Sequence, residues 1–167
     1  TVTNNGALIF NRSVNTSYVA PFAGSGPLTV AGSGGLTLTG VASYTGLTTV
    51  TSSAITYTNN TTPSTSGFAG AGTVTIAPAS GSSFTSAFTP SYTFASTLTG
   101  LTLGSSSNTQ NITLAAPISI SGPITVDGGQ INLNSSLQTT ASSAAINIRA
   151  KTNIANTSLA TLTTNGG

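Results

Sequence analysis

Apolar and polar residues alternate in short triplets along this chain. Leu28-Thr29-Val30 is one example, with an apolar residue on either side of a polar one. A period of two places the first and third residues on one face of a strand and the second on the other. Each triplet therefore predicts a short strand with one buried face. The triplets stand at residues 28–30, 36–38, 55–57, 74–76, 101–103, 112–114, 118–120, 124–126, 131–133 and 146–148.

The spacing of these triplets predicts a parallel β-helix. Triplets starting at Ile112, Ile118, Ile124 and Ile131 follow one another every six or seven residues, with Ser, Gly, Pro and Asn between them. Antiparallel sandwiches place their turns further apart, every 8–12 residues. A coil of roughly 20 residues would give about eight coils, and a rise of ~4.8 Å per coil would make a rod about 40 Å long. Thr, Ser, Asn, Val, Ile and Gly dominate the chain, and none of them favours helix.

We expect residues 1–167 to form a single solenoid segment with one irregular excursion, at about residues 59–95. Pro63, Pro78 and Pro90 interrupt the rhythm there. The same stretch holds half of the aromatic side chains. These could cap one flank of the solenoid, contact a ligand such as a sugar, or lie in the core, the commoner fate of Phe. These candidate contact residues are Phe68, Phe84, Phe88, Tyr92 and Phe94.

Charge is almost absent, and this excludes most catalytic chemistry. The charged residues are Arg12, Asp127, Arg149 and Lys151, which make 2% of the chain, and there is no His and no Cys. General acid–base catalysis needs His, paired carboxylates or a tuned Lys, and thiolate metal sites need Cys. Nucleic-acid binding needs a clustered basic surface. We therefore expect no enzyme activity, cofactor, metal or nucleic-acid partner, and no membrane span because no apolar run approaches ~20 residues.

Three narrower alternatives remain open. Lys151 could activate a serine, although a solvated lysine is favoured. Asp127 could belong to a calcium-binding coil, although calcium wants six to eight oxygen ligands and a lone Asp is better read as a corner residue. Thr-x-Thr pairs could bind ice if they stood in rows, but their intervals share no period. The pairs are Thr37/Thr39, Thr49/Thr51, Thr56/Thr58, Thr73/Thr75, Thr97/Thr99 and Thr161/Thr163.

Residues 5–56 resemble the autotransporter-associated β-strand repeat of Gram-negative passenger domains. The resemblance rests on residues 5–12, 24–28, 32–40 and 44–50, and it departs from the repeat at Ala31 and Leu47. Residues 112–167 are more loosely similar to filamentous-haemagglutinin-like giant adhesins. The resemblance implies a right-handed β-helix, secretion across the outer membrane and a structural role, and it brings no catalytic residues.

These expectations combine into a leading function, a stalk or spacer in a secreted bacterial surface adhesin. The absence of Met indicates a fragment of a longer chain, anchored to the outer membrane through another part. Its partners would be a host or abiotic surface, or glycans, reached through the parent protein. The alternatives are a self-assembling extracellular fibre or biofilm-matrix protein, which could associate end to end because little charge keeps copies apart, and an ice-binding solenoid.

Overall fold

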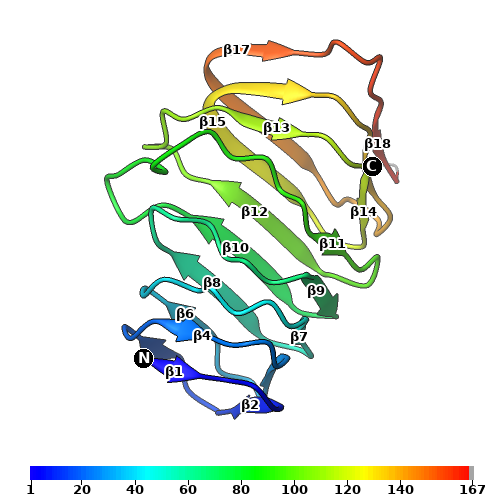
Figure 1. Ribbon diagram of the computed structural model, residues 1–167. Coiled ribbons are helices and arrows are strands. Elements are labelled where there is room, and N and C mark those ends of the chain that lie inside the picture. Colours follow the sequence, from blue (N-terminus) through cyan, green and yellow to red (C-terminus); the bar gives the residue numbers. More distant parts are fainter. Residues whose placement is uncertain (166–167) are drawn as a thin grey trace.

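Short strands follow one another along a winding path of about eight turns, so that the chain is an all-β parallel β-solenoid (Figure 1). A computed structural model describes residues 1–165, and those residues contain strands but no helix. All strand pairings among the described residues are parallel, and most strands of the two larger sheets pair with strands of the turns before and after them. The predicted fold class is confirmed.

The largest face is an eight-stranded sheet that runs through most of the turns. Its order is β13-β15-β12-β10-β8-β6-β3, and β17 also pairs with β15. Its strands are β3 (Thr16–Tyr18), β6 (Leu36–Leu38), β8 (Ala54–Thr58), β10 (Thr73–Ala77), β12 (Gly100–Gly104), β13 (Ile112–Leu114), β15 (Ile124–Leu133) and β17 (Ile146–Ala155).

Smaller sheets form the other faces. A five-stranded sheet contains β2 (Leu8–Asn11), β5 (Leu28–Ala31), β7 (Thr48–Val50), β9 (Gly67–Gly70) and β11 (Thr93–Phe94). A three-stranded sheet contains β14 (Ile118–Ile120), β16 (Leu137–Thr139) and β18 (Leu162–Thr164), and β1 (Val2–Thr3) pairs with β4 (Phe22–Ala23). Each turn of the chain thus contributes short strands to several faces around one interior.

The long strand β15 turns a corner without a break. Its first half pairs with β12, its second half pairs with β13, and β17 follows it along both halves. The register with β17 shifts between Gly128 and Gln130, where a bulge bends the strand. This corner carries Asp127 and becomes important below.

The core consists of the inward residues of the predicted triplets, stacked turn upon turn. Val74 lies between Ile55 and Leu101, and all three are at most 2% exposed. Burying such a side chain contributes roughly 1.5–3 kcal/mol. A side chain is fully buried only when a turn covers it on both sides. Ile131 is fully buried, whereas its register partner in the last turn, Ile154, is 46% exposed.

The stretch 59–95 belongs to the same stack. It contains β9, β10 and β11, and its extra residues lie in the connections between those strands. In the five-stranded sheet Leu8 pairs with Leu28, whereas Phe68 pairs with Phe94, so that the turn that starts at Phe68 is the longer one. The irregularity predicted for this stretch is therefore a longer corner, with the strands on either side of it kept in register.

Candidate functional site

A row of threonines crosses the outer face of the eight-stranded sheet. Each member is the central residue of an apolar–polar–apolar triplet, and each pairs in register with the next. The row continues into Ser17 below and Asn147 above. Neighbouring parallel strands lie about 4.8 Å apart, which sets the spacing of the side chains. The threonine row is Thr37, Thr56, Thr75, Thr102 and Thr125.

The uneven intervals between the Thr-x-Thr pairs did not reveal this row, because a row depends on the register between strands and not on one constant interval in sequence. The interval from Thr37 to Thr56 is shorter than the interval from Thr75 to Thr102, yet both pairs stand directly opposite each other. The corners absorb the difference in length. The middle residue of each triplet, which points outward, predicts the row, whereas the Thr-x-Thr pairs do not.

The Thr-x-Thr pairs themselves are divided among different places. Thr39 and Thr58 flank the row on one side and Thr73 flanks it on the other. Thr49 lies on the five-stranded sheet, and Thr163 lies on the three-stranded sheet. Thr97 and Thr99 lie outside the strands, and their hydroxyls donate to the carbonyl oxygens of Gly70 and Ala71.

The hydroxyls of the threonine row have no such partners. Among residues 1–165, no side-chain hydrogen bond engages the five row hydroxyls, and all five side chains are partly exposed. Each hydroxyl can therefore donate one hydrogen bond and accept others from outside the protein. The row is an ordered set of polar groups that faces solvent.

One charged corner lies beside the upper end of the row. Asp127 and Arg149 are register partners in β15 and β17, and the guanidinium binds the carboxylate with two bonds, Nε–Oδ1 at 2.5 Å and Nη2–Oδ2 at 2.8 Å. Hydrogen bonding to Asp127 and its negative charge raise the pKa of Arg149. The Asp127 side chain is 7% exposed and that of Arg149 is 65% exposed, so the pair neutralises a nearly buried carboxylate. Sequence reasoning missed this pair, although the interval between its members is close to the length of one coil.

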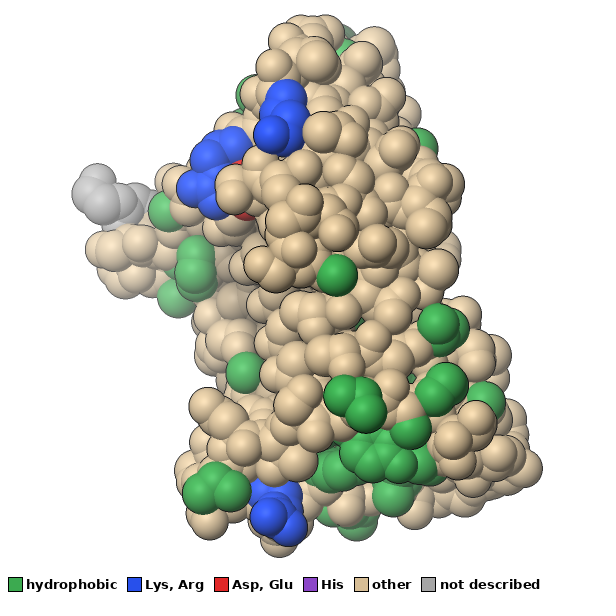
Figure 2. All heavy atoms as spheres, turned by 90° about the vertical axis from the view of Figure 1, so that its left-hand side faces the viewer, with side chains coloured by type: hydrophobic (Ala, Val, Ile, Leu, Met, Phe, Trp, Pro, Cys, Tyr) green, Lys and Arg blue, Asp and Glu red, His purple; other side chains and the backbone are tan. Residues whose placement is uncertain are grey.

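Lys151 and two serines share a small hollow with this ion pair. The hollow, of about 130 Å³, is lined by Asp127, Arg149, Lys151, Ser105 and Ser106, with Gly128 and Ala150. The Ser105 hydroxyl bonds the hydroxyl of Ser107 at 3.0 Å, and no hydrogen bond among the described residues joins Lys151 to a serine. Figure 2 shows the two basic side chains of this corner next to the acidic one. The geometry provides a salt-bridged corner without an activated nucleophile.

A cluster of buried hydroxyls lies inside the solenoid. The hydroxyl of Tyr44 bonds those of Thr48, at 2.6 Å, and of Tyr57. The hydroxyl of Thr65 bonds that of Thr48 at 3.1 Å and donates to the carbonyl oxygen of Gly46 at 2.6 Å. Burial raises the pKa of Tyr44 and raises that of Tyr57 well above the usual value. All four residues are buried, so the cluster holds successive coils together and offers nothing to a ligand.

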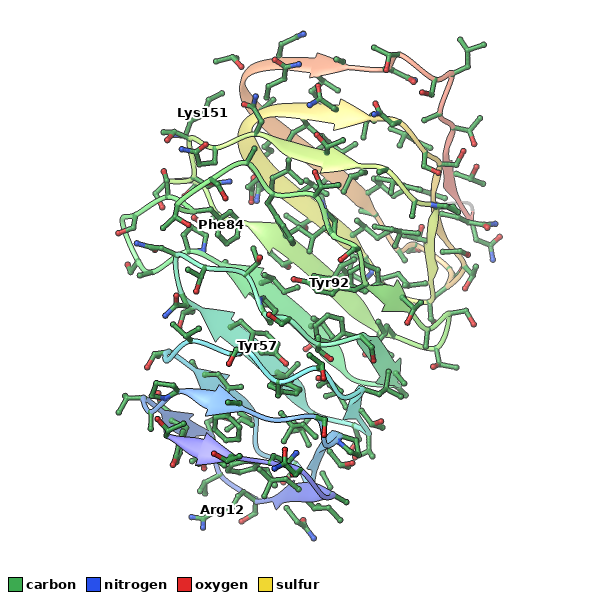
Figure 3. All side chains as sticks on the ribbon, viewed as in Figure 1. Arg12, Tyr57, Phe84, Tyr92 and Lys151 are labelled. Carbon is green, nitrogen blue, oxygen red and sulfur yellow. The ribbon has the colours of Figure 1, made fainter. Side chains whose placement is uncertain are left out.

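The aromatic residues considered as ligand contacts are mostly in the core. Phe68, Phe84, Phe88 and Tyr92 are 1%, 3%, 4% and 9% exposed, and only Phe94 is partly exposed. Tyr92 donates a hydrogen bond of 2.6 Å to the carbonyl oxygen of Pro63. In Figure 3, Tyr57, Phe84 and Tyr92 lie within the solenoid, whereas Arg12 and Lys151 lie at its surface. The rings pack on one another, which leaves the four buried ones no free face on which a sugar could stack.

The described residues contain no group of three His, Cys, Asp or Glu side chains that could hold a metal ion. Asp127 lies within β15, where its carboxylate is engaged by Arg149. Among residues 1–165 there is also no helix with the length and apolarity to cross a membrane.

Comparisons with known proteins leave the family of the chain open. No family model matches it, and no curated protein or solved structure shows significant similarity to it. The resemblance to the autotransporter-associated repeat stays a prediction.

Proposed function

We propose that this chain is a non-catalytic stalk or spacer segment of a secreted bacterial surface adhesin. The observation that supports this most is the uninterrupted stacking of inward side chains along the solenoid, from Leu36 in β6 to Ile146 in β17. In a solenoid each coil contacts only its neighbours, so that length can grow coil by coil without a new core. The parent protein would use this length to hold a binding region away from the cell, toward a host surface, an abiotic surface or a glycan.

The chemistry of the described residues fits a spacer. The one salt bridge found among them joins Asp127 to Arg149, and Lys151 has no activated partner. The outward strand positions carry Thr, Ser and Asn, which hydrogen-bond water and suit the surface of a sheet. Such a surface keeps a long rod hydrated without many charges.

Surface labelling of the source bacterium tests this proposal. Antibodies against the purified chain should label intact cells, and external protease should remove the label, because the chain would lie outside the outer membrane. A deletion of residues 102–124, which joins Leu101 to Thr125 at equivalent points of successive coils, should leave a folded β-rich protein and preserve adhesion. Label found only after the cells are broken would contradict the proposal.

A self-assembling fibre is the second candidate, and exposed apolar side chains favour it. Val14, Val19 and Val41 are 58%, 75% and 44% exposed, and Figure 2 shows hydrophobic side chains gathered over the N-terminal coils. With only four charged residues, little repulsion would separate two copies. Sedimentation of the purified chain should then show larger species as concentration rises, and Val19→Lys should reduce them. A single monomeric species at all concentrations would exclude this candidate.

A further inference from the structure

The outer face of the eight-stranded sheet presents a regular set of free hydroxyls. The threonine row spans five successive strands, β6, β8, β10, β12 and β15, and the register places each member directly beside the next. These strands lie side by side in Figure 1. The hydroxyls therefore repeat at about 4.8 Å along the solenoid axis. Regular spacing of this kind matches a ligand that is itself a lattice.

The hydroxyls of the row differ from those of several other threonines, which bond the protein itself. Thr51, Thr97 and Thr99 donate to carbonyl oxygens of the previous turn, at 3.2, 2.7 and 2.8 Å. Within residues 1–165 the row hydroxyls have no protein partner, although each is partly exposed. The described fold thus satisfies many surface hydroxyls internally and leaves this aligned set to solvent.

The positions beside the row are small and uncharged over most of its length. On one side Ala54 pairs with Thr73, and Thr73 pairs with Gly100. On the other side Thr58 pairs with Ala77. Charge enters only at the upper end, where Asp127 pairs with Gly104 on one side and with Arg149 on the other. From Thr37 to Thr102, the flanking residues therefore have no bulky side chain that would keep the flat surface of a ligand away from the row hydroxyls.

We propose that this face binds an ordered layer of water, and through it the surface of an ice crystal, with the threonine row as the anchor. Each Thr offers a hydroxyl that hydrogen-bonds water and a methyl group that keeps water out of the gap between neighbouring hydroxyls. Water molecules bound to the row would therefore be held at the spacing of the strands. The row offers no aromatic face on which a sugar ring could stack, since Tyr57, the aromatic residue within this stretch of the sheet, points into the core at 2% exposure. This binding is independent of the spacer role, because it uses only the outward side chains.

Thermal hysteresis and inhibition of ice recrystallisation by the purified full chain test the proposal. The wild-type chain should lower the freezing point below the melting point and shape ice crystals. Thr75→Lys places a long charged side chain at the middle of the row, between Thr56 and Thr102, and should remove most of the hysteresis. Thr49→Lys is the matched control, since Thr49 is also an outward, partly exposed strand residue but lies on the five-stranded sheet, and it should retain the wild-type value.

A second variant guards against misfolding. Thr75→Val keeps the shape and removes the hydroxyl, so its circular dichroism spectrum should match the wild type while its hysteresis falls. The proposal is overturned if the wild-type chain shows no hysteresis and no ice shaping at high concentration, or if Thr75→Lys and Thr49→Lys lose activity equally. Binding to a glycan array or face-to-face dimerisation, lost in Thr75→Lys without any effect on ice, would assign the face to another partner and would also overturn it.

Discussion

The eight-stranded sheet and the corner at residues 78–92 differ in how they accommodate a turn that contains more residues. The turn from Val74 to Leu101 takes more residues than the turn before it, from Ile55 to Val74. The register of the sheet is unaffected by this difference, because Thr56, Thr75 and Thr102, which follow these residues, remain in one row. The corner takes up the added residues and buries Phe84 and Phe88 in doing so. The register of a solenoid is therefore held by its strands, while its corners are free to vary.

The largest effect should come from removing a stacked side chain. Leu103 is fully buried between Ile76 and Val126 in the eight-stranded sheet. Leu103→Ala should lower the free energy of unfolding by about 2–5 kcal/mol, because the neighbouring coils cannot collapse into the space. Insertion of Gly-Ser between Ser80 and Gly81, both exposed in the corner, should cost less than about 1 kcal/mol. Urea denaturation followed by circular dichroism measures both, and equal losses would show that the corner is as constrained as the sheet.

A smaller effect should follow from the two glycines with positive φ that lie in these two regions. Gly104, at the end of β12, has φ +84° and a Cβ there would overlap the carbonyl oxygen of Asp127. Gly81, in the corner, has φ +72° but nothing within 4 Å of such a Cβ. Gly104→Ala should therefore cost about 1–3 kcal/mol, and Gly81→Ala should cost distinctly less. Thermal unfolding of the two variants provides the measurement, and a greater loss in Gly81→Ala would reverse the comparison.

The smallest effect on stability near neutral pH should come from the ionisation of one buried tyrosine in each region. Burial raises the pKa of Tyr57, in the sheet, well above the usual value, and that of Tyr92, in the corner, to about 12. In the unfolded chain both lose their protons near pH 10. The folded state binds more protons above that pH, so stability should be steady from pH 7 to about 9 and fall as the pH rises further.

Replacing each tyrosine by Phe separates the two contributions. Tyr57→Phe and Tyr92→Phe should each make the alkaline loss of stability less steep, because each removes a phenol whose pKa is raised in the folded chain. Urea midpoints measured between pH 8 and 11 give the slopes. Unchanged slopes in both variants would mean that neither phenol titrates differently in the folded chain.

Local pattern predicted the strands well and the surface features poorly. The triplets identified most of the strands of the eight-stranded sheet, since an inward–outward–inward alternation depends only on neighbours in sequence. The same triplets contained the threonine row, but the intervals between them hid it. The aromatic residues at 68–94 looked available for ligands because composition does not reveal which side of a corner faces the interior.

Local sequence was enough to specify the fold class. Short amphipathic strands, almost no charge and breakers every few residues are properties of local stretches, and they suffice to specify stacked coils. Which residues meet followed only from the folded chain, because their separation along the sequence differs from one contact to the next and the coil length varies. The fold pairs Asp127 with Arg149, brings Tyr44 against Tyr57, buries Tyr92 within the corner and aligns the threonine row. Those contacts depend on the register between turns, which is set by the packing of whole coils against each other.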